Sequence, residues 1–177
     1  MKNLQKTSVN IYHHFLNGLS LDAKKRADFE NGIMTWTVPC LPGVLKAIGK
    51  NKDTVVCWDE LVTADKPAAI LLRPDYPSVW RDGRDLCHVE VNIVDENGIL
   101  VPDSSRTIQF DVSPQGKIVA VDNGNLWSTE SYKATHRRAF HGRCMVIIQA
   151  TGKPGRIELT ATSLGLTPAE LTIDVAK

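Results

Sequence analysis

The side chains that most often carry out catalysis are present in this sequence, but they are scattered. A hydrolase needs a nucleophile beside a base, or two facing carboxylates, and a metal enzyme needs ligands at a fixed spacing. His13 and His14 are adjacent, so in a strand they would point to opposite faces and would not share a metal ion. His136 and His141 flank an Arg-Arg-Ala-Phe stretch, and we expect both at the surface. The sequence therefore predicts no catalytic residue and no metal site.

Two segments rich in Asp, Asn and Gly invite comparison with ion-binding loops. They span residues 82–85 (DGRD) and 122–125 (DNGN). Neither has the alternating ligands and the distant Glu of a calcium loop, and turns in which Asp and Asn bond the local backbone account for both. The sequence also lacks a glycine-rich phosphate-binding motif. We therefore predict no cofactor.

Tryptophan offers a different chemistry, because the flat indole can stack on the apolar C–H face of a sugar. Trp36 shares strand parity with Val38, and we expect it in the core. Trp80 and Trp127 lie in loop-like segments and are the candidate sugar-stacking residues. The alternative is that a loop tryptophan only caps the end of a hydrophobic core.

Two of the four cysteines are placed for burial. Cys87 shares strand parity with Val89 and Val91, and Cys144 shares it with Val146. Their separation along the chain suits the inter-sheet disulfide of an immunoglobulin-type sandwich. The alternative is that both are reduced and serve as small core residues.

Composition limits the classes of partner. The chain has 177 residues, 42% of them hydrophobic and 23% charged, which is ordinary for a globular protein. The formal net charge is +1, so nothing in it attracts nucleic acid or anionic membranes strongly. No stretch approaches the ~20 apolar residues that span a bilayer. We predict neither a nucleic-acid partner nor a membrane partner.

Apolar and polar residues alternate along much of the chain, which indicates strands rather than helices. The clearest strands are residues 86–95, 106–112, 144–150, 156–163 and 169–177, with Gly, Pro, Asn and Asp between them. Short strands at this spacing predict an all-β, immunoglobulin-like β-sandwich. A boundary near residues 64–67 divides the chain into two consecutive modules. They are an incomplete β module at residues 1–66 and a complete sandwich at residues 67–177.

Two local predictions concern the first module. Residues 20–30 read as a polar connection with one helical turn. Residues 35–49 (TWTVPCLPGVLKAIG) begin like a strand and break at Pro42-Gly43, which fits the central positions of a type II turn between two strands.

A series of segments follows a known order and spacing: HFLNGLSL at 14–21, TWTVPCLPGVLKAIG at 35–49, ELVTADKPAAILLRPD at 60–75, RDGRDLCHVEVNIVDENGILVPDS at 81–104, VDNGN at 121–125 and AFHGRCMVIIQATGKPGRIELTATSLGL at 139–166. Together they resemble the C-terminal region of bacterial glycoside hydrolase family 2 enzymes of the β-galactosidase type. The resemblance covers nearly the whole chain, from about His14 to Val175.

The resemblance implies two immunoglobulin-like modules that follow the catalytic barrel of a parent hydrolase. The family's catalytic residues are two glutamates on a (β/α)₈ barrel, a fold that needs about 250 residues and alternating helices. None of the seven glutamates of this chain lies in a family catalytic motif, so the resemblance assigns no catalytic residue here. The implied partners are the parent's barrel, which is absent from this chain, and a second subunit of a homo-oligomer.

The chain also departs from the family pattern. Cys40 stands where the family usually has an aromatic residue, and Asp22 and Asp65 stand where it has glycine. The earliest strands of the first module are missing, which favours an excised or truncated C-terminal piece.

Three hypotheses for function follow. The first is a structural or oligomer-packing role in a β-galactosidase-like enzyme, whose location we expect to be periplasmic or extracellular. The second is a carbohydrate-binding module that uses Trp80 or Trp127. The third is a bacterial cell-surface immunoglobulin-like module, because the GRIELTATSLGL stretch at 155–166 also resembles such repeats.

Overall fold

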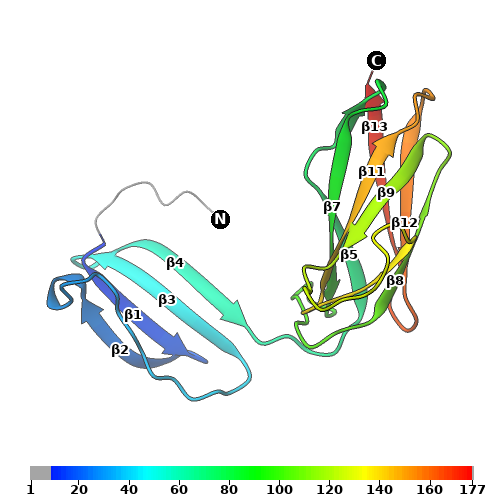
Figure 1. Cartoon of the computed structure of the whole chain (residues 1–177). Helices are drawn as coiled ribbons and strands as arrows, with labels where there is room; N and C mark the ends of the chain where they lie inside the picture. The colour runs from blue at the N-terminus through cyan, green and yellow to red at the C-terminus, as the bar shows by residue number, and fades with distance from the viewer. Residues whose placement is uncertain (1–8, 177) are drawn as a thin grey trace. The chain divides into compact units, whose positions relative to one another are not determined.

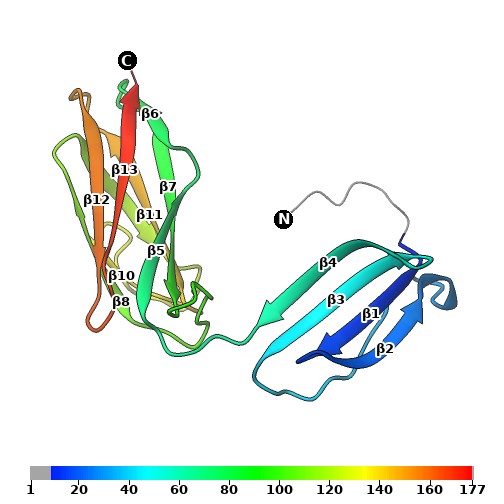
Figure 2. The same cartoon turned by 180° about the vertical axis from the view of Figure 1, so that it is seen from behind.

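The computed structural model describes residues 9–176, which divide into two compact units between Thr63 and Ala64 (Figures 1 and 2). Residues 1–8 of the predicted first module lie outside the described residues. Within 9–176, every regular element is a β-strand apart from one 3₁₀ turn at Arg26–Asp28. The predicted all-β class is confirmed.

The first unit is one antiparallel sheet with strand order β2-β1-β3-β4. Its strands are β1 (Ile11–Leu16), β2 (Leu19–Lys25), β3 (Val44–Asn51) and β4 (Thr54–Val62). Asn17 and Gly18 link β1 to β2 with φ angles of 51° and 80°. Positive φ at both turn residues matches the twist of the strands that they join, which explains the Asn-Gly pair.

The prediction for residues 20–30 is confirmed in its helical turn, which is the 3₁₀ turn at Arg26–Asp28, but not in its connection, because β2 occupies residues 19–25. A second prediction for this unit is wrong. Residues 33–41 form no regular structure, and Gly43 has a φ of 134° rather than the value near 80° of a type II turn. Pro42-Gly43 therefore joins an irregular segment, not a strand, to β3.

The second unit is a sandwich of two sheets (Figure 2). One sheet has the strand order β10-β8-β12-β13-β6, and the other has the order β5-β7-β11-β9. The strands are β5 (Ala69–Pro74), β6 (Ser78–Trp80), β7 (Leu86–Val94), β8 (Thr107–Val112), β9 (Gly116–Asp122), β10 (His136–Arg138), β11 (Arg143–Ala150), β12 (Arg156–Thr162) and β13 (Ala169–Ala176). All pairs are antiparallel except β13 with β6. The predicted sandwich is confirmed for this unit.

The core of the sandwich lies between its two sheets. Val89 and Ile93 of β7 are fully buried, and so are Ile157 and Leu159 of β12 in the facing sheet. Phe110 of β8 fills the space between them with only 1% of its surface exposed. Alternate residues of each strand therefore face one shared core, as a sandwich requires.

Cys87 and Cys144 are both buried in this core, but they are free thiols. Their strands, β7 and β11, are neighbours in one sheet, with Cys87 opposite Ile148 and Cys144 opposite Val91. An offset of four residues along paired strands separates the cysteines by about 13 Å, whereas the Cα atoms of a disulfide lie within about 7 Å. The inter-sheet disulfide is therefore the wrong one of the two alternatives, and the other, two reduced cysteines in the core, is confirmed. Burial raises the pKa of Cys87 to about 11 and that of Cys144 to about 12, so both stay protonated and unreactive.

Asp95 closes the turn that follows β7 and also binds the start of the second unit. Its Oδ2 accepts a hydrogen bond from the Asp65 N–H at 2.9 Å, and its Oδ1 accepts from the N–H groups of Asn97 and Ile99, each at 2.9 Å. The backbone N–H groups of Asp65, Ile99 and Asn97 hold the pKa of Asp95 below its usual value.

We expect Asp95→Asn to destabilise the second unit at neutral pH, because the amide accepts weaker hydrogen bonds and its NH₂ cannot accept one. Since folding lowers the pKa of Asp95, its stabilisation is complete above the unfolded value of about 3.9. It is lost as the pH falls through the folded value. Urea unfolding should be measured between neutral pH and about pH 3. The difference in unfolding free energy between wild type and Asp95→Asn should become smaller as the pH falls. Glu96→Gln, an exposed change in the same turn, is the control. A difference between Asp95→Asn and wild type that stays constant with pH would contradict a stabilising role of the Asp95 carboxylate.

Candidate functional site

The histidines and acidic side chains are the first candidates for metal ligands. Within residues 9–176, no group of three or more His, Cys, Asp or Glu side chains could hold a metal ion. His13 bonds Ser20 Oγ at 2.7 Å, whereas His14 stacks on Trp36 with ring centroids 3.9 Å apart. His136 and His141 are exposed, as expected. In the same range, no helix is long and apolar enough to cross a membrane.

One cluster does combine a thiol, an imidazole and a carboxylate. His88 Nδ1 lies 3.0 Å from Asp75 Oδ2, and the neighbouring Cys87 thiol donates to the Tyr76 carbonyl at 3.4 Å. A nucleophilic cysteine must be exposed and partly ionised. Cys87 is fully buried and its pKa is raised, so this cluster holds the β5–β6 connection rather than performing chemistry.

The polar network at one end of the second unit is organised by Arg137. This β10 residue is fully buried, yet it carries a charge. Its Nη1 donates to the Glu130 carbonyl at 3.1 Å, and its Nη2 donates to Asn123 Oδ1 at 3.0 Å and to Asp122 Oδ1 at 3.4 Å. Nε lies 3.8 Å from Glu130 Oε2, within ion-pair reach. The planar guanidinium therefore ties β10 to both ends of residues 122–130.

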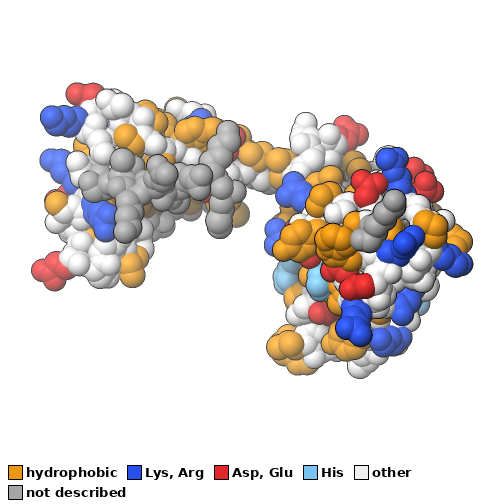
Figure 3. All heavy atoms as spheres, turned by 90° about the horizontal axis from the view of Figure 1, so that it is seen from above, with side chains coloured by type: hydrophobic (Ala, Val, Ile, Leu, Met, Phe, Trp, Pro, Cys, Tyr) orange, Lys and Arg blue, Asp and Glu red, His pale blue; other side chains and the backbone are white. Residues whose placement is uncertain are grey.

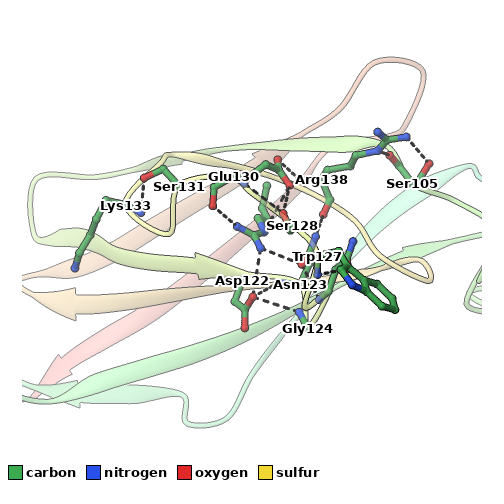
Figure 4. Close-up of polar contacts among 12 residues, drawn as sticks. Ser105, Asp122, Asn123, Gly124, Trp127, Ser128, Glu130, Ser131, Lys133 and Arg138 are labelled. Carbon is green, nitrogen blue, oxygen red and sulfur yellow. Dashed lines mark hydrogen bonds and ion pairs between the residues drawn. The ribbon is translucent and has the colours of Figure 1, made fainter.

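Bonds inside residues 123–130 fix the rest of this segment, which we call the Trp127 loop (Figure 4). Asn123 Oδ1 accepts from the Asn125 N–H at 3.0 Å, and Asn125 Oδ1 accepts from the Trp127 N–H at 3.1 Å. Glu130 accepts from the Ser128 hydroxyl at 3.2 Å and from the Arg138 N–H at 3.1 Å. The predicted turn chemistry of residues 122–125 thus serves to orient Trp127.

Trp127 itself projects away from this network (Figure 4). Its side chain is 89% exposed, and that of the neighbouring Leu126 is 95% exposed. A hollow of about 560 Å³ is lined by Trp127 together with Asn125, Ser128, Ser105 and Arg138. Hydroxyl, amide and guanidinium groups thus line the same hollow as an exposed aromatic ring.

Trp80 does not join this site. It is the last residue of the edge strand β6, not of a loop, and its side chain is 61% exposed. β6 pairs with the end of β13, near the C-terminus, whereas β9 runs to the opposite end before the Trp127 loop begins (Figures 1 and 2). The structure therefore separates the two predicted sugar-stacking residues.

Sequence reasoning missed Arg137, Arg138 and Glu130, because nothing in their local pattern marks them. The signal that was available is the DNGN segment, since Asn and Asp turns often fix a loop in one conformation. Charge gives no further guidance. Acidic and basic side chains are mixed over the visible face of the second unit (Figure 3).

A second surface lies on the first unit. Val44 pairs with Val62, and Ile48 pairs with Trp58, so these side chains share one face of the sheet. We call it the Trp58 face; its apolar members are Ile11, Phe15, Val44, Ile48, Trp58 and Val62. His13, Lys46, Lys50 and Glu60 lie on the same face, where Lys46 pairs with Glu60 at 3.7 Å and lies 4.7 Å from the centroid of the Trp58 ring. Trp58 is 60% exposed. Within residues 9–63 no second sheet covers this face, whereas the irregular segment at 33–41 reaches the opposite one through Trp36.

Comparison with known proteins places these features in a family. Residues 70–172 match glycoside hydrolase family 2 C-terminal domain 5. The chain is 46% identical over 159 residues to the β-galactosidase BoGH2A of Bacteroides ovatus, covering 90% of this chain and 19% of that protein. It is 29% identical over 119 residues to a β-galactosidase of Thermoanaerobacter pseudethanolicus, covering 67% of this chain and 14% of that protein.

Solved structures agree. A glycosyl hydrolase family 2 member from Bacteroides cellulosilyticus matches with a TM-score of 0.89 and 31% identity, over 96% of this chain and 22% of that one. A β-glycosidase from Bacteroides vulgatus matches with a TM-score of 0.87 and 30% identity, over 94% and 21%. The chain thus spans about a fifth of the length of these relatives. Since the family match covers more than half of its residues, the chain belongs to glycoside hydrolase family 2, and its residues 70–172 form the C-terminal domain 5 of that family.

Proposed function

We propose that this chain has a structural role in a β-galactosidase-type hydrolase, in which it packs against the remaining part of the enzyme. The observation that carries the proposal is the group of exposed and half-buried apolar side chains on the Trp58 face. Burying a large apolar side chain contributes about 1.5–3 kcal/mol, so a face that exposes Trp58 and Val62 gains free energy from a cover. The relatives are about five times longer than the chain, and their additional residues supply a candidate cover.

Catalysis by the chain alone is the first thing to test. We expect the purified chain to hydrolyse nitrophenyl β-galactoside no faster than buffer, because none of its glutamates lies in a catalytic motif of the family that it resembles. Turnover that follows the chain through purification would overturn the structural proposal.

Trp58→Ser tests the packing itself. The preceding region of the parent hydrolase is expressed separately and mixed with the chain. We expect wild type to co-purify with it and Trp58→Ser to bind about tenfold more weakly or worse, as for a buried aromatic anchor. Leu19→Ser, a change at another exposed apolar residue of the same sheet (74% exposed), should bind like wild type.

A second copy of this chain is the competing occupant. Light scattering on the chain alone distinguishes it. If the wild-type chain is a dimer, Trp58→Ser is a monomer and neither binds the preceding region, the proposal of packing within one enzyme is wrong. The role of the chain would then be to form a homo-oligomer. The open edges of β2 and β4 would then be part of the contact.

Carbohydrate binding is a second candidate function, and the hollow beside Trp127 favours it. Sugar-binding sites need an aromatic platform and hydrogen-bonding groups around it, and both are present there. The cell-surface alternative gains no support, because the family to which the chain belongs is a hydrolase family.

A further inference from the structure

We propose that the hollow beside Trp127 is a binding site for a neutral saccharide, with the Trp127 indole as its stacking platform. The proposal rests on carbohydrate binding, the second function above. It places the binding site at Trp127, at one end of the second unit, rather than at either Trp80 or Trp127. It also names the class of ligand.

The first argument is that the Trp127 loop is held in one conformation before any ligand arrives. The two ends of the loop bond the guanidinium of Arg137, which is fully buried, and the backbone N–H of Trp127 donates to Asn125 Oδ1. A loop with this many internal bonds loses little conformational entropy on binding. Folding does not need the indole, which is 89% exposed. Together with Leu126, which is 95% exposed, the indole forms an exposed apolar patch on a fixed backbone, and such patches mark contact surfaces.

The second argument is the match between the hollow and the two surfaces of a pyranose. A pyranose has an apolar C–H face and a rim of hydroxyl groups. Trp127 offers a flat apolar surface, and Ser105, Ser128 and Arg138 offer hydrogen-bonding groups around the same hollow. Its volume, about 560 Å³, lies within the range of small-molecule sites.

The third argument concerns charge and indicates a neutral ligand. Glu130 and Arg138 both line the hollow, so their charges offset each other. The Glu130 carboxylate accepts from Ser128 and from the Arg138 N–H, and Arg138 Nε donates to the Ser105 carbonyl at 2.9 Å. No unpaired cation dominates the hollow, so an anionic sugar gains nothing over a neutral one.

The test follows the four tryptophan indole N–H signals of the full chain by NMR. The probes are lactose, a β-1,4-linked galactotetraose and cellotetraose at millimolar concentration, with a galacturonic acid oligomer as the anionic comparison. We expect the Trp127 signal to shift saturably with at least one neutral probe, and more weakly with the anionic one. Trp127→Ala should lower the affinity by about tenfold or more without a change in unfolding temperature. Trp80→Ala, a matched change at the other exposed tryptophan, should leave the affinity unchanged.

The outcomes separate the site from the function. Saturable binding that survives Trp127→Ala but not Trp80→Ala would overturn this site and leave carbohydrate binding standing. The absence of binding by all probes would overturn both, and leave the structural role untouched. If the sugars fail and Trp127→Ala instead abolishes co-purification with the preceding region of the hydrolase, Trp127 is a protein contact and the saccharide site is wrong.

Discussion

Arg137→Ala is expected to lower the unfolding free energy of the second unit by about 3 kcal/mol, because three hydrogen bonds of about 1 kcal/mol each disappear. The acceptors are the Glu130 carbonyl and the side chains of Asn123 and Asp122. The cavity left by the fully buried side chain adds to the loss. Thermal unfolding should show a decrease of roughly 10 °C for a unit of this size.

Arg138→Ala is the matched control, since Arg138 is the next residue of β10 but is exposed and bonds only Ser105 through its side chain. We expect a far smaller change there. Arg137→Lys should recover only part of the loss, because an ammonium cannot reproduce the planar fork. Limited proteolysis within residues 123–130 should accelerate in Arg137→Ala alone. If Arg137→Ala and Arg138→Ala behave alike, the buried guanidinium does not anchor the Trp127 loop.

Gly43→Ala is expected to destabilise the first unit by about 3 kcal/mol, through backbone strain and two lost hydrogen bonds. Gly43 has a φ of 134°, and a Cβ there would lie 1.8 Å from Asn17 Oδ1. Asn17 cannot yield cheaply, because its side chain donates to the Pro42 carbonyl at 3.1 Å and accepts from the Val44 N–H at 2.8 Å. Hydrogen exchange in residues 44–62 should accelerate, while exchange in residues 143–150 of the second unit should not.

Two further variants divide this effect into its parts. Gly18→Ala places an alanine at a milder positive φ, 80°, with no heavy atom within 4 Å of the added Cβ, so it gives a lower bound for the contribution of backbone strain alone. Asn17→Ala removes the hydrogen bonds and adds the smaller cost of an alanine at a φ of 51°. In the Asn17→Ala background, Gly43→Ala should cost less than it does in wild type, because the clash is gone. Strict additivity would show that Asn17 does not determine the cost.

The sequence predicted the sandwich because its central strands report burial directly. Alternate residues of β7, from Cys87 to Ile93, point into the core, and the period of two is visible in the chain. β2 was missed because it is an edge strand with few apolar residues. Residues 35–40 look like a strand locally, but Trp36 is held by contacts with His14 and Lys24 from elsewhere in the chain.

The candidate site could be predicted only in part, because its geometry depends on partners that are distant in sequence. The exposure of Trp127 follows from its polar, turn-rich surroundings. The burial of Arg137 does not, since His136 and Arg138 on either side look equally polar and both are exposed. The disulfide alternative for Cys87 and Cys144 fails for a similar reason: alternation along a strand gives the face of a residue, but not the sheet that its strand joins.

The parallel pair β6–β13 affects how the second unit folds on the ribosome, because its two strands are synthesised far apart in time. β6 lies at the edge of its sheet and pairs only with β13 among the described strands, while β13 also pairs with β12. β6 is thus made early but waits for residues 169–176 before it has a partner. Until then β12 presents an unpaired edge, which is prone to association with other chains. The nascent second unit therefore has a vulnerable interval that closes only with its last strand, whereas neighbouring strands such as β1 and β2 can pair as soon as they emerge.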